Sequence, residues 1–194
     1  VIVNDTSGNI NQSEYAGVIG QIITVNSTNL LGCEDLDVPN IQYNLTKDVE
    51  SAGTCFYVLA NNITLDCKGF EINYSQSVIG YGVNVSSYNY STIRSCNIVQ
   101  ADLATDNLNS YGVYVFKNAS NNIVFNNSIE TRGTSAYGAY LTRTVYNNSV
   151  YNNTITTSGS IGIGVILFTT AYNNSVYSNS ITTSAINGYG VRLQ

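Results

Sequence analysis

Short runs of alternating apolar and polar residues recur along the chain and predict β-strands. Clear examples are the runs Ser-Val-Tyr, Thr-Ile-Thr and Gly-Val-Ile-Leu-Phe, which are separated by Asn, Ser and Gly. Alternation with a period of two places the apolar side chains on one face of a strand. No stretch shows the helical period of an amphipathic helix, and the helix-favouring residues Glu, Lys, Ala and Leu are scarce. We therefore expect an all-β protein.

The strands belong to an internal repeat of about 26 residues, because the segments that begin at Asn121, Asn147 and Asn173 are copies of one another. A landmark glycine recurs once in every repeat: Gly82, Gly112, Gly138, Gly164 and Gly190. Strands and turns alone, at about 22 to 30 residues per repeat, are typical of one rung of a β-solenoid. A β-propeller blade needs about 40 residues, and the leucine-rich-repeat consensus is missing.

These repeats predict a right-handed parallel β-helix of about eight rungs. Residues 1–40 are expected to form an N-terminal edge segment and first rung, and residues 41–194 the β-helix repeats, which become regular from residue 121. The predicted inward columns are Val83, Val113, Ala139, Val165, Val191; Val85, Val115, Leu141, Leu167, Leu193; Leu65, Ile93, Val124, Val150, Val176; and Ile72, Ile98, Ile129, Ile155, Ile181. The residues predicted to point outward are Asn84, Tyr114, Tyr140, Ile166 and Arg192. Because rungs stack about 4.8 Å apart, we expect an amide ladder of Asn127, Asn153 and Asn179.

The repeats resemble a known family. The segments TLDCKGFEI, followed by a Gly-Val strand, then STIRSCNIV and NNSVYNNTI, are similar to the NosD-like and pectate-lyase-like parallel β-helix repeat proteins. The stretch from residue 43 to residue 72 looks especially like secreted archaeal surface members. The resemblance covers residues 41–194 and implies the fold. It leaves the function open, because this fold hosts lyases, hydrolases, binding modules and surface fibres.

The four cysteines indicate disulfides, since the count is even and other features of the chain point to secretion. Cys33 and Cys55 are separated by close to one rung of sequence, and so are Cys67 and Cys96. Residues one rung apart are adjacent in the stack and within bridging reach, so we expect the pairs Cys33–Cys55 and Cys67–Cys96. Four buried free thiols are the alternative. A zinc site is less favoured because the chain has no His and no Cys-x-x-Cys.

Sequons for N-glycosylation also favour an extracellular or cell-surface location. The chain begins at Val1 without a methionine, which favours removal of an upstream signal segment. Random placement of the 28 Asn and 40 Ser or Thr gives about six sequons, half the number found. The alternative is that Asn-rich turns generate sequons as a by-product. The thirteen candidates are Asn4, Asn11, Asn26, Asn44, Asn62, Asn73, Asn84, Asn89, Asn118, Asn126, Asn147, Asn152 and Asn173.

Charge excludes several function classes. Seven basic residues and a net charge of −5 argue against a nucleic-acid partner, and no apolar run approaches the ~20 residues of a membrane span.

We expect no cofactor, no metal and no catalysis, because His is absent and Glu130 is the only acid after Asn121. Asp66 and Arg94 are interpreted as a surface ion pair. The cluster of Glu34, Asp35 and Asp37 is interpreted as a solvated loop rather than a cation site, which leaves a polysaccharide lyase or hydrolase as a minor alternative.

Aromatic residues form outward columns. Phe125, Tyr151 and Tyr177 share one face, and Tyr114 and Tyr140 share another; further tyrosines, Tyr81, Tyr111, Tyr137 and Tyr189, precede the landmark glycines. Such columns stack on themselves, contact a partner protein, or bind sugar rings. The last of these interpretations predicts a carbohydrate-binding or adhesion module.

The ends of the chain favour self-assembly. The chain stops in mid-repeat after Val191 and Leu193, and no amphipathic helix covers its start. Uncapped solenoid ends expose strand edges and apolar core, so we expect head-to-tail assembly into a filament or surface layer. The expected contacts are Val1, Ile2, Val3 and Asn4 at one end and Tyr189, Val191 and Leu193 at the other. The alternative is a piece of a longer solenoid.

Overall fold

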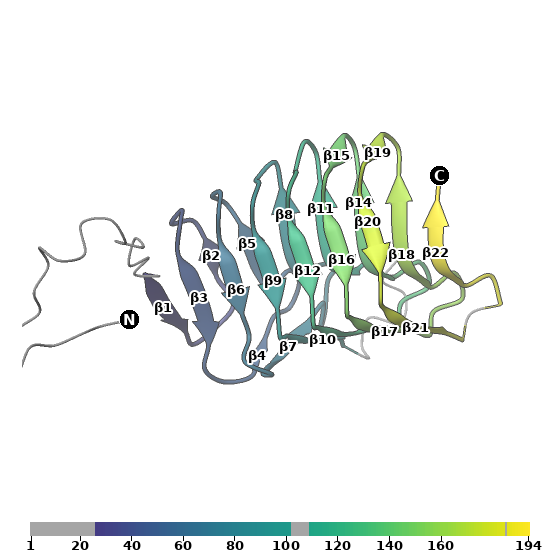
Figure 1. Ribbon diagram of the computed structural model, residues 1–194. Coiled ribbons are helices and arrows are strands. Elements are labelled where there is room, and N and C mark those ends of the chain that lie inside the picture. Colours follow the sequence, from purple (N-terminus) through teal and green to yellow (C-terminus); the bar gives the residue numbers. More distant parts are fainter. Residues whose placement is uncertain (1–25, 102–108, 185) are drawn as a thin grey trace, which may run out of the picture.

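A computed structural model describes residues 26–101, 109–184 and 186–194, and within these residues every regular element is a β-strand (Figure 1). Three parallel sheets run along the molecule. The first sheet contains β1 (Ser27–Leu30), β3 (Gln42–Leu45), β6 (Thr64–Asp66), β9 (Thr92–Arg94), β12 (Ile123–Phe125), β16 (Ser149–Tyr151) and β20 (Ser175–Tyr177). The second contains β4 (Val49–Glu50), β7 (Glu71–Tyr74), β10 (Asn97–Gln100), β13 (Ser128–Thr131), β17 (Thr154–Thr157) and β21 (Ser180–Thr183). The third contains β2 (Asp35–Leu36), β5 (Phe56–Val58), β8 (Tyr81–Ser86), β11 (Tyr111–Phe116), β14 (Tyr137–Thr142), β18 (Ile163–Phe168) and β22 (Tyr189–Leu193).

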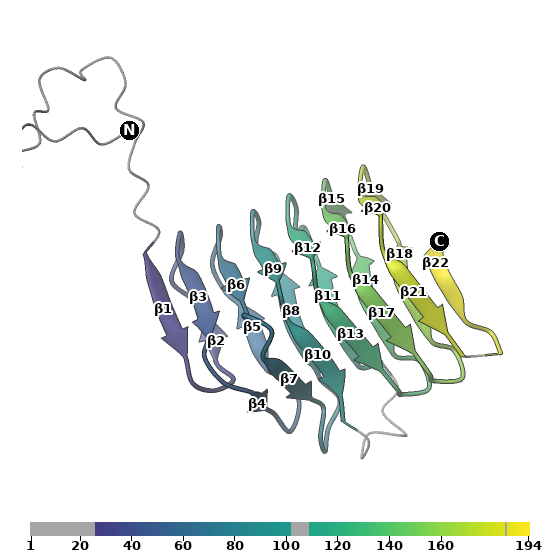
Figure 2. The ribbon, with the colours of Figure 1, turned by 60° about the horizontal axis from the view of Figure 1, so that its bottom comes forward.

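The chain visits the three sheets in the same order in each rung, a rung being one complete turn of the solenoid (Figure 2). A short fourth sheet pairs β15 (Val145–Tyr146) with β19 (Ala171–Tyr172). The described residues form an incomplete first rung, which lacks a strand in the second sheet, and six complete rungs. The prediction of a parallel β-solenoid is confirmed, whereas the expectation of about eight rungs is slightly too high.

Strand register confirms the predicted inward columns. Val113 pairs with Ala139, Val124 with Val150, and Ile129 with Ile155, so equivalent side chains lie directly above one another. These residues belong to one buried core that runs along the solenoid axis. In the last rung the same columns reach solvent, because Val191 is 45% and Leu193 75% exposed. Ile166, which points outward by register, is nevertheless buried.

The landmark glycines permit close packing between rungs. A Cβ atom on Gly138 would lie 2.3 Å from Cγ2 of Ile155 and 2.6 Å from the carbonyl oxygen of Gly164, both in the next rung. Gly82, Gly112 and Gly164 meet equivalent obstacles at almost the same distances. Any side chain here would push successive rungs apart, which explains why the glycine recurs in each repeat.

Asparagine in left-handed backbone conformation builds the turns at the ends of the first-sheet strands. Asn126 and Asn152 follow this sheet with φ of 57° and 53°, and Asn147 and Asn173 precede it with φ of 55° and 54°. Asn tolerates this region better than most residues because its short polar side chain bonds locally. The Asn-rich composition is therefore a consequence of turns that repeat once per rung.

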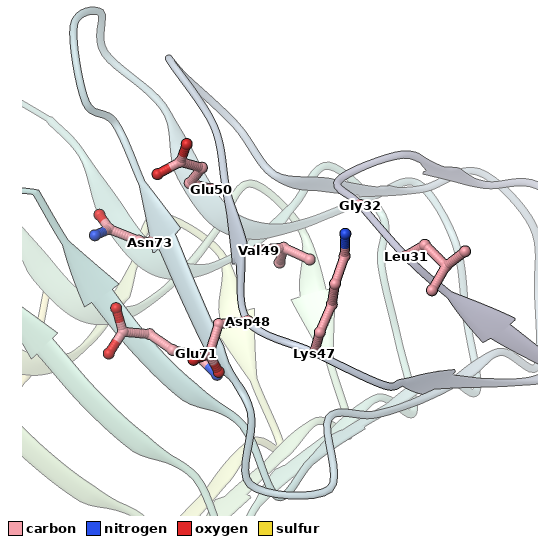
Figure 3. Close-up of a pocket in the computed structure, with 8 residues that line it drawn as sticks. All are labelled: Leu31, Gly32, Lys47, Asp48, Val49, Glu50, Glu71 and Asn73. Atoms are coloured by element: carbon pink, nitrogen blue, oxygen red, sulfur yellow. The ribbon is translucent and has the colours of Figure 1, made fainter.

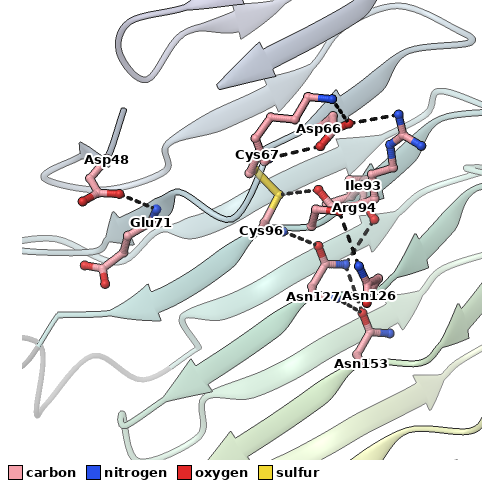
Figure 4. Close-up of a disulfide and its surroundings, with 12 residues drawn as sticks. Asp48, Asp66, Cys67, Glu71, Ile93, Arg94, Cys96, Asn126, Asn127 and Asn153 are labelled. Carbon is pink, nitrogen blue, oxygen red and sulfur yellow. Dashed lines mark hydrogen bonds and ion pairs between the residues drawn. A yellow bond between two sulfur atoms is a disulfide. The ribbon is translucent and has the colours of Figure 1, made fainter. Parts of the chain in front are cut away.

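Both predicted disulfides are present. Cys33–Cys55 joins the segments before β2 and β5, with a Cα–Cα distance of 4.6 Å, and Cys67–Cys96 joins the segments after β6 and β9, with a Cα–Cα distance of 4.7 Å (Figure 4). Each bridge connects neighbouring rungs, as the rung-length spacing predicts. None of the described residues lies in a helix that is long and apolar enough to cross a membrane.

Candidate functional surfaces

Two buried amide ladders run along the solenoid. The predicted ladder links Asn127, Asn153 and Asn179: the backbone N–H and Nδ2 of Asn127 donate to Oδ1 of Asn153, and those of Asn153 donate to Oδ1 of Asn179, all at 3.0 Å. Each Nδ2 also donates to a carbonyl one rung back, as from Asn153 to Val124. The side-chain oxygens of Asn153 and Asn179 thus each satisfy two donors that would otherwise be buried without partners, and that of Asn127 accepts the backbone N–H of Cys96.

The second ladder, which links Asn122, Asn148 and Asn174, has the same geometry and was missed by the sequence reasoning. Its signal was present in the Asn-Asn pair that opens each copy of the repeat. The two ladders end at Asn174 and Asn179, whose backbone N–H groups have no acceptor within the part of the chain that the structure describes.

The last rung forms an exposed end surface, which we define by Val176, Ile181, Val191 and Leu193 together with Asn174, Asn179, Gly190 and the rings of Tyr172, Tyr177 and Tyr189. Its core-type side chains lie at positions that are buried one rung earlier, in Val150, Ile155, Val165 and Leu167. β20, β21 and β22 are each at the edge of their sheet among the described residues. The end surface therefore combines apolar side chains with a row of unpaired backbone groups.

The outward aromatic columns on the first and fourth sheets stack upon themselves. The rings of Phe125 and Tyr151 lie 5.3 Å apart with planes 11° from parallel, those of Tyr151 and Tyr177 lie 4.9 Å apart at 6°, and those of Tyr146 and Tyr172 lie 5.3 Å apart at 9°. Rings that stack at the rung spacing cover each other's faces and present only their edges sideways. A sugar ring on the outer surface therefore finds no free face within a column. Tyr172 and Tyr177 each end a column on the end surface.

A denser aromatic cluster covers the third sheet. The rings of Tyr81, Tyr111 and Tyr137 stack at 5.4 and 5.1 Å, and Tyr114 and Tyr140 pack against them. Burial, followed by the neighbouring tyrosines, raises the pKa of Tyr111 and of Tyr114 far above the ordinary value. Both hydroxyls stay protonated at physiological pH, so the charge beside this cluster comes from Arg143, which lies 5.1 Å from the ring centre of Phe116, and Arg192, which lies 5.5 Å from that of Tyr189.

Asp66 holds a charged network on the first sheet (Figure 4). Its carboxylate accepts the backbone N–H of Lys68 at 3.0 Å and pairs with Lys68 Nζ at 2.7 Å and Arg94 Nη2 at 2.9 Å. Arg94 also donates to Gln42 Oε1 at 3.3 Å. Burial alone would raise the pKa of Asp66, but the hydrogen bonds and charges from Lys68 and Arg94 outweigh it and lower that pKa. The predicted ion pair between Asp66 and Arg94 is present, with the Arg94 side chain 34% exposed, but the Asp66 side chain is only 5% exposed, so its carboxylate is buried rather than at the surface.

A shallow hollow of about 390 Å³ near the first rungs gathers several acids (Figure 3). Each carboxylate is engaged locally: Asp48 accepts the backbone N–H of Glu71, Glu50 accepts Gln76 Nε2, and Glu71 accepts Asn97 Nδ2. Glu34, Asp35 and Asp37 do not line it. No group of three acids, cysteines or histidines among the described residues is arranged to hold a metal ion. Local hydrogen bonds therefore hold the three acids that line the hollow.

The sequons divide into two structural classes, with Asn4 and Asn11 outside the described residues. Exposed residues, most of them in turns, are Asn26, Asn62, Asn118, Asn126, Asn147, Asn152 and Asn173. Partly buried residues are Asn44, Asn73, Asn84 and Asn89. Asn84 accepts a hydrogen bond at 2.6 Å from Ser86, the hydroxyl residue of its own sequon. In the sequons that begin at Asn126, Asn147, Asn152 and Asn173, the middle residue is a ladder Asn, so turn chemistry alone accounts for these four motifs.

Comparison with known proteins yields no relative: no family model matches the chain, and neither a curated protein nor a solved structure matches it. The functional argument therefore depends on the fold and on these surfaces.

Proposed function

We propose that the protein is a structural subunit of an extracellular filament or surface layer, in which copies of the chain assemble head to tail. The observation that carries this proposal is the end surface, where side chains of the core columns and the edges of all three sheets are exposed together. Exposed strand edges beside apolar side chains form a template for further β-pairing. A contact between two different ends is heterologous, and where successive copies continue along the solenoid axis instead of closing into a ring, it propagates into a fibre.

Disulfides and glycosylation acceptors, which would stabilise the protein outside the cell, support the same function. Two disulfides join neighbouring rungs near the start of the described solenoid, and bridges of this kind persist in oxidising compartments. The exposed turn sequons supply acceptors for covalent N-glycans, among them Asn62, Asn118, Asn126, Asn147 and Asn152. The resemblance to NosD-like and pectate-lyase-like proteins, and to secreted archaeal surface members, agrees with this function, because the parallel β-helix fold hosts surface fibres among other proteins.

The second candidate is a carbohydrate-binding or adhesion module that uses the tyrosine faces. Self-stacking of Tyr151 on Phe125 and Tyr177 weakens it, because the ring faces are occupied within the column. A polysaccharide lyase or hydrolase has less support. The carboxylate of Asp66 forms ion pairs with Lys68 and Arg94, and the acids of the hollow accept hydrogen bonds from neighbouring residues.

Electron microscopy of native, untagged material tests the proposal. We expect filaments with an axial repeat of at least roughly 30 Å, which is the height of six to seven rungs at about 4.8 Å each. Leu193→Asp places a charge in the end surface and should abolish them, whereas Thr182→Asp, on an exposed outward position of β21 in the same rung, should not. Isolated rods of the unaltered protein at micromolar concentration would overturn the filament, and saturable glycan binding that Tyr151→Ala removes would favour the second candidate.

A further inference from the structure

The outer face of the third sheet differs in chemistry from that of the second sheet. Outward positions of the second sheet are polar, as in the column of Glu71, Asn97, Ser128 and Thr154. The third sheet instead carries the aromatic cluster on β8, β11 and β14, which Phe116 and Phe168 extend. A sheet face that contacts only water normally carries polar side chains, so an aromatic face indicates a contact with another molecule.

Strand register aligns one central outward column along the third sheet. The strands β2, β5, β8, β11, β14, β18 and β22 contribute one residue each. The column begins at Asp35, ends at Arg192 and includes Tyr57, Tyr114, Tyr140 and Ile166 between them. β11, which carries Tyr114, is the middle strand of this sheet. The column therefore has an acid at one end, a cation at the other and aromatic rings about its centre.

The wider charge distribution has the same direction. Residues 26–101 carry seven acids and three basic residues, whereas residues 109–194 carry one acid and four basic residues. Glu34 and Asp37, which flank Asp35, are exposed as it is. Two copies side by side in the same direction would place like charges opposite each other. Copies that point in opposite directions place the acidic rungs of one beside the basic rungs of the other, which is electrostatically favourable.

We propose that the third sheet binds a second copy of this chain face to face and antiparallel, about a twofold axis that is parallel to the strands and passes beside Tyr114. The two aromatic clusters pack on each other, and Asp35 lies opposite Arg192 of the partner subunit. This contact goes beyond the proposed function, because it uses the side of the solenoid and does not depend on end-to-end assembly. It is isologous, so it joins two copies and then closes.

The dimensions of the third sheet suit such a contact. Seven strands at about 4.8 Å cover roughly 29 Å along the axis, and a six-residue strand such as β11 is about 20 Å long. The face thus offers roughly 600 Å² per copy, or about 1,200 Å² in all, which reaches the lower range of specific interfaces. Sheets that pack face to face lie about 10 Å apart, a gap that an opposed Asp and Arg can bridge.

The glycosylation acceptors leave this face open. None of the exposed sequon residues among the described ones lies on a strand of the third sheet. Asn84, the sequon residue on β8, is only partly exposed, and its Oδ1 accepts a hydrogen bond from Ser86. A glycan at Asn84 would fill the space of the opposing sheet. The contact therefore requires that Asn84 is unmodified, and a glycan found there by peptide mass spectrometry of the native protein would overturn it.

Sedimentation velocity of Val176→Asp tests the contact. This change adds a charge to the end surface on the first sheet and leaves the third sheet as it is. We expect a species of twice the monomer mass, and monomers alone at micromolar concentration would overturn the inference. In filaments of the unaltered protein the same contact should join antiparallel pairs, which electron microscopy can show even if Val176→Asp does not fold.

Reversing the charges tests the orientation. Arg192→Asp and Asp35→Arg each replace attraction by repulsion at two symmetric positions, so each should raise the Kd of the dimer about tenfold or more. The double variant restores opposite charges across the interface and should return the Kd to its starting value. Lys47→Asp, an exposed position outside the third sheet, is the matched control and should leave it unchanged. Thermal melts show that each variant is folded, and a double variant that stays as weak as the single ones would overturn the antiparallel arrangement.

The outcomes separate this inference from the proposed function. Dimers of Val176→Asp, with no filaments of the unaltered protein, would support the lateral contact and contradict the filament. Filaments without lateral pairs, together with monomeric Val176→Asp, would do the reverse. A monomer that binds an oligosaccharide saturably, and loses it in Tyr140→Ala, would give the face to a sugar and overturn the second copy as its occupant.

Discussion

Asn127 donates from both its backbone N–H and its Nδ2 to the single Oδ1 of Asn153, each at 3.0 Å. Both residues are buried, so that one oxygen satisfies two donors that water does not reach. A buried donor left without a partner costs about 1–3 kcal/mol. The ladders therefore stabilise the solenoid although they consist of polar groups, and they do so only while each rung carries its Asn.

We predict that Asn153→Ala lowers the free energy of unfolding by about 2–4 kcal/mol, because it strands the donors of Asn127 and frees the carbonyl of Val124. Guanidinium denaturation of the dissociated protein measures the loss. The control is Asn152→Gly, at an exposed neighbour with φ of 53°, where glycine is readily accommodated. A similar loss in both variants would mean that the ladder contributes nothing specific.

Close packing at the landmark glycines gives a second prediction. Gly138→Ala places a methyl group 2.6 Å from a backbone oxygen and 2.3 Å from Ile155, so rungs must separate. We expect a loss of roughly 3 kcal/mol or more, seen as a lower denaturant midpoint. Gly190→Ala is the same change in the same column with open space above it, and it should cost less than about 1 kcal/mol in the dissociated subunit. Equal losses would contradict the steric explanation.

The two disulfides should differ in their access to reductant. Cys67 and Cys96 are almost fully buried, whereas Cys33 is partly exposed. Under native conditions a soluble thiol should therefore open Cys33–Cys55 first, which timed alkylation followed by peptide mass spectrometry will show. In denaturant the order should disappear. Faster opening of Cys67–Cys96 in the native protein would contradict the burial argument.

Removing a bridge should cost stability through loop closure. The Cys67–Cys96 bridge has a sequence separation of 29, for which chain entropy gives about 3–4 kcal/mol. Changing both Cys67 and Cys96 to alanine keeps the site apolar and should lower the free energy of unfolding by about 3–4 kcal/mol. Denaturant melts of the variant beside the unaltered protein measure the loss, and an unchanged midpoint would contradict the loop-closure argument.

Local pattern was sufficient to predict much of this fold. Alternation fixed the inward columns, because Val124 over Val150 and Ile129 over Ile155 follow from a period of two within a regular repeat. The disulfide pairing followed from rung-length spacing. The second ladder was equally readable, since Asn122 and Asn148 occupy equivalent places in copied segments.

Other features depend on relations that a one-dimensional pattern does not contain. Asp66 is buried because Lys68 and Arg94 both close over it from different positions, and sequence spacing paired it with Arg94 alone. Alternation placed Tyr151 and Tyr177 on the outer face but did not reveal the plane of their rings, which side-chain rotation determines. The orientation of the rings matters for the proposed sugar-binding surface. Because the rings stack along the solenoid axis, their free faces are not on the side of the solenoid but at its end.

The aromatic cluster on the third sheet should make the fold sensitive to alkali. Burial, with the neighbouring tyrosines, holds the pKa of Tyr111 above the usual value of 10.0, so the folded state favours its neutral form. A raised folded pKa leaves stability unaffected below the unfolded pKa of about 10 and removes it as the pH rises beyond that value towards the folded pKa. We therefore expect the free energy of unfolding to be level up to about pH 10 and to fall above it.

Tyr111→Phe, which keeps the ring stack with Tyr81 and Tyr137, should make that alkaline fall shallower. Denaturant melts at intervals from about pH 8 to about pH 12, a range that spans tyrosine titration, measure the slope of each variant. Tyr177→Phe, on the exposed end surface, is the matched control, because it also removes a tyrosine hydroxyl but from a residue that is 51% exposed rather than buried. An unchanged slope in Tyr111→Phe would show that this residue does not carry the alkaline response.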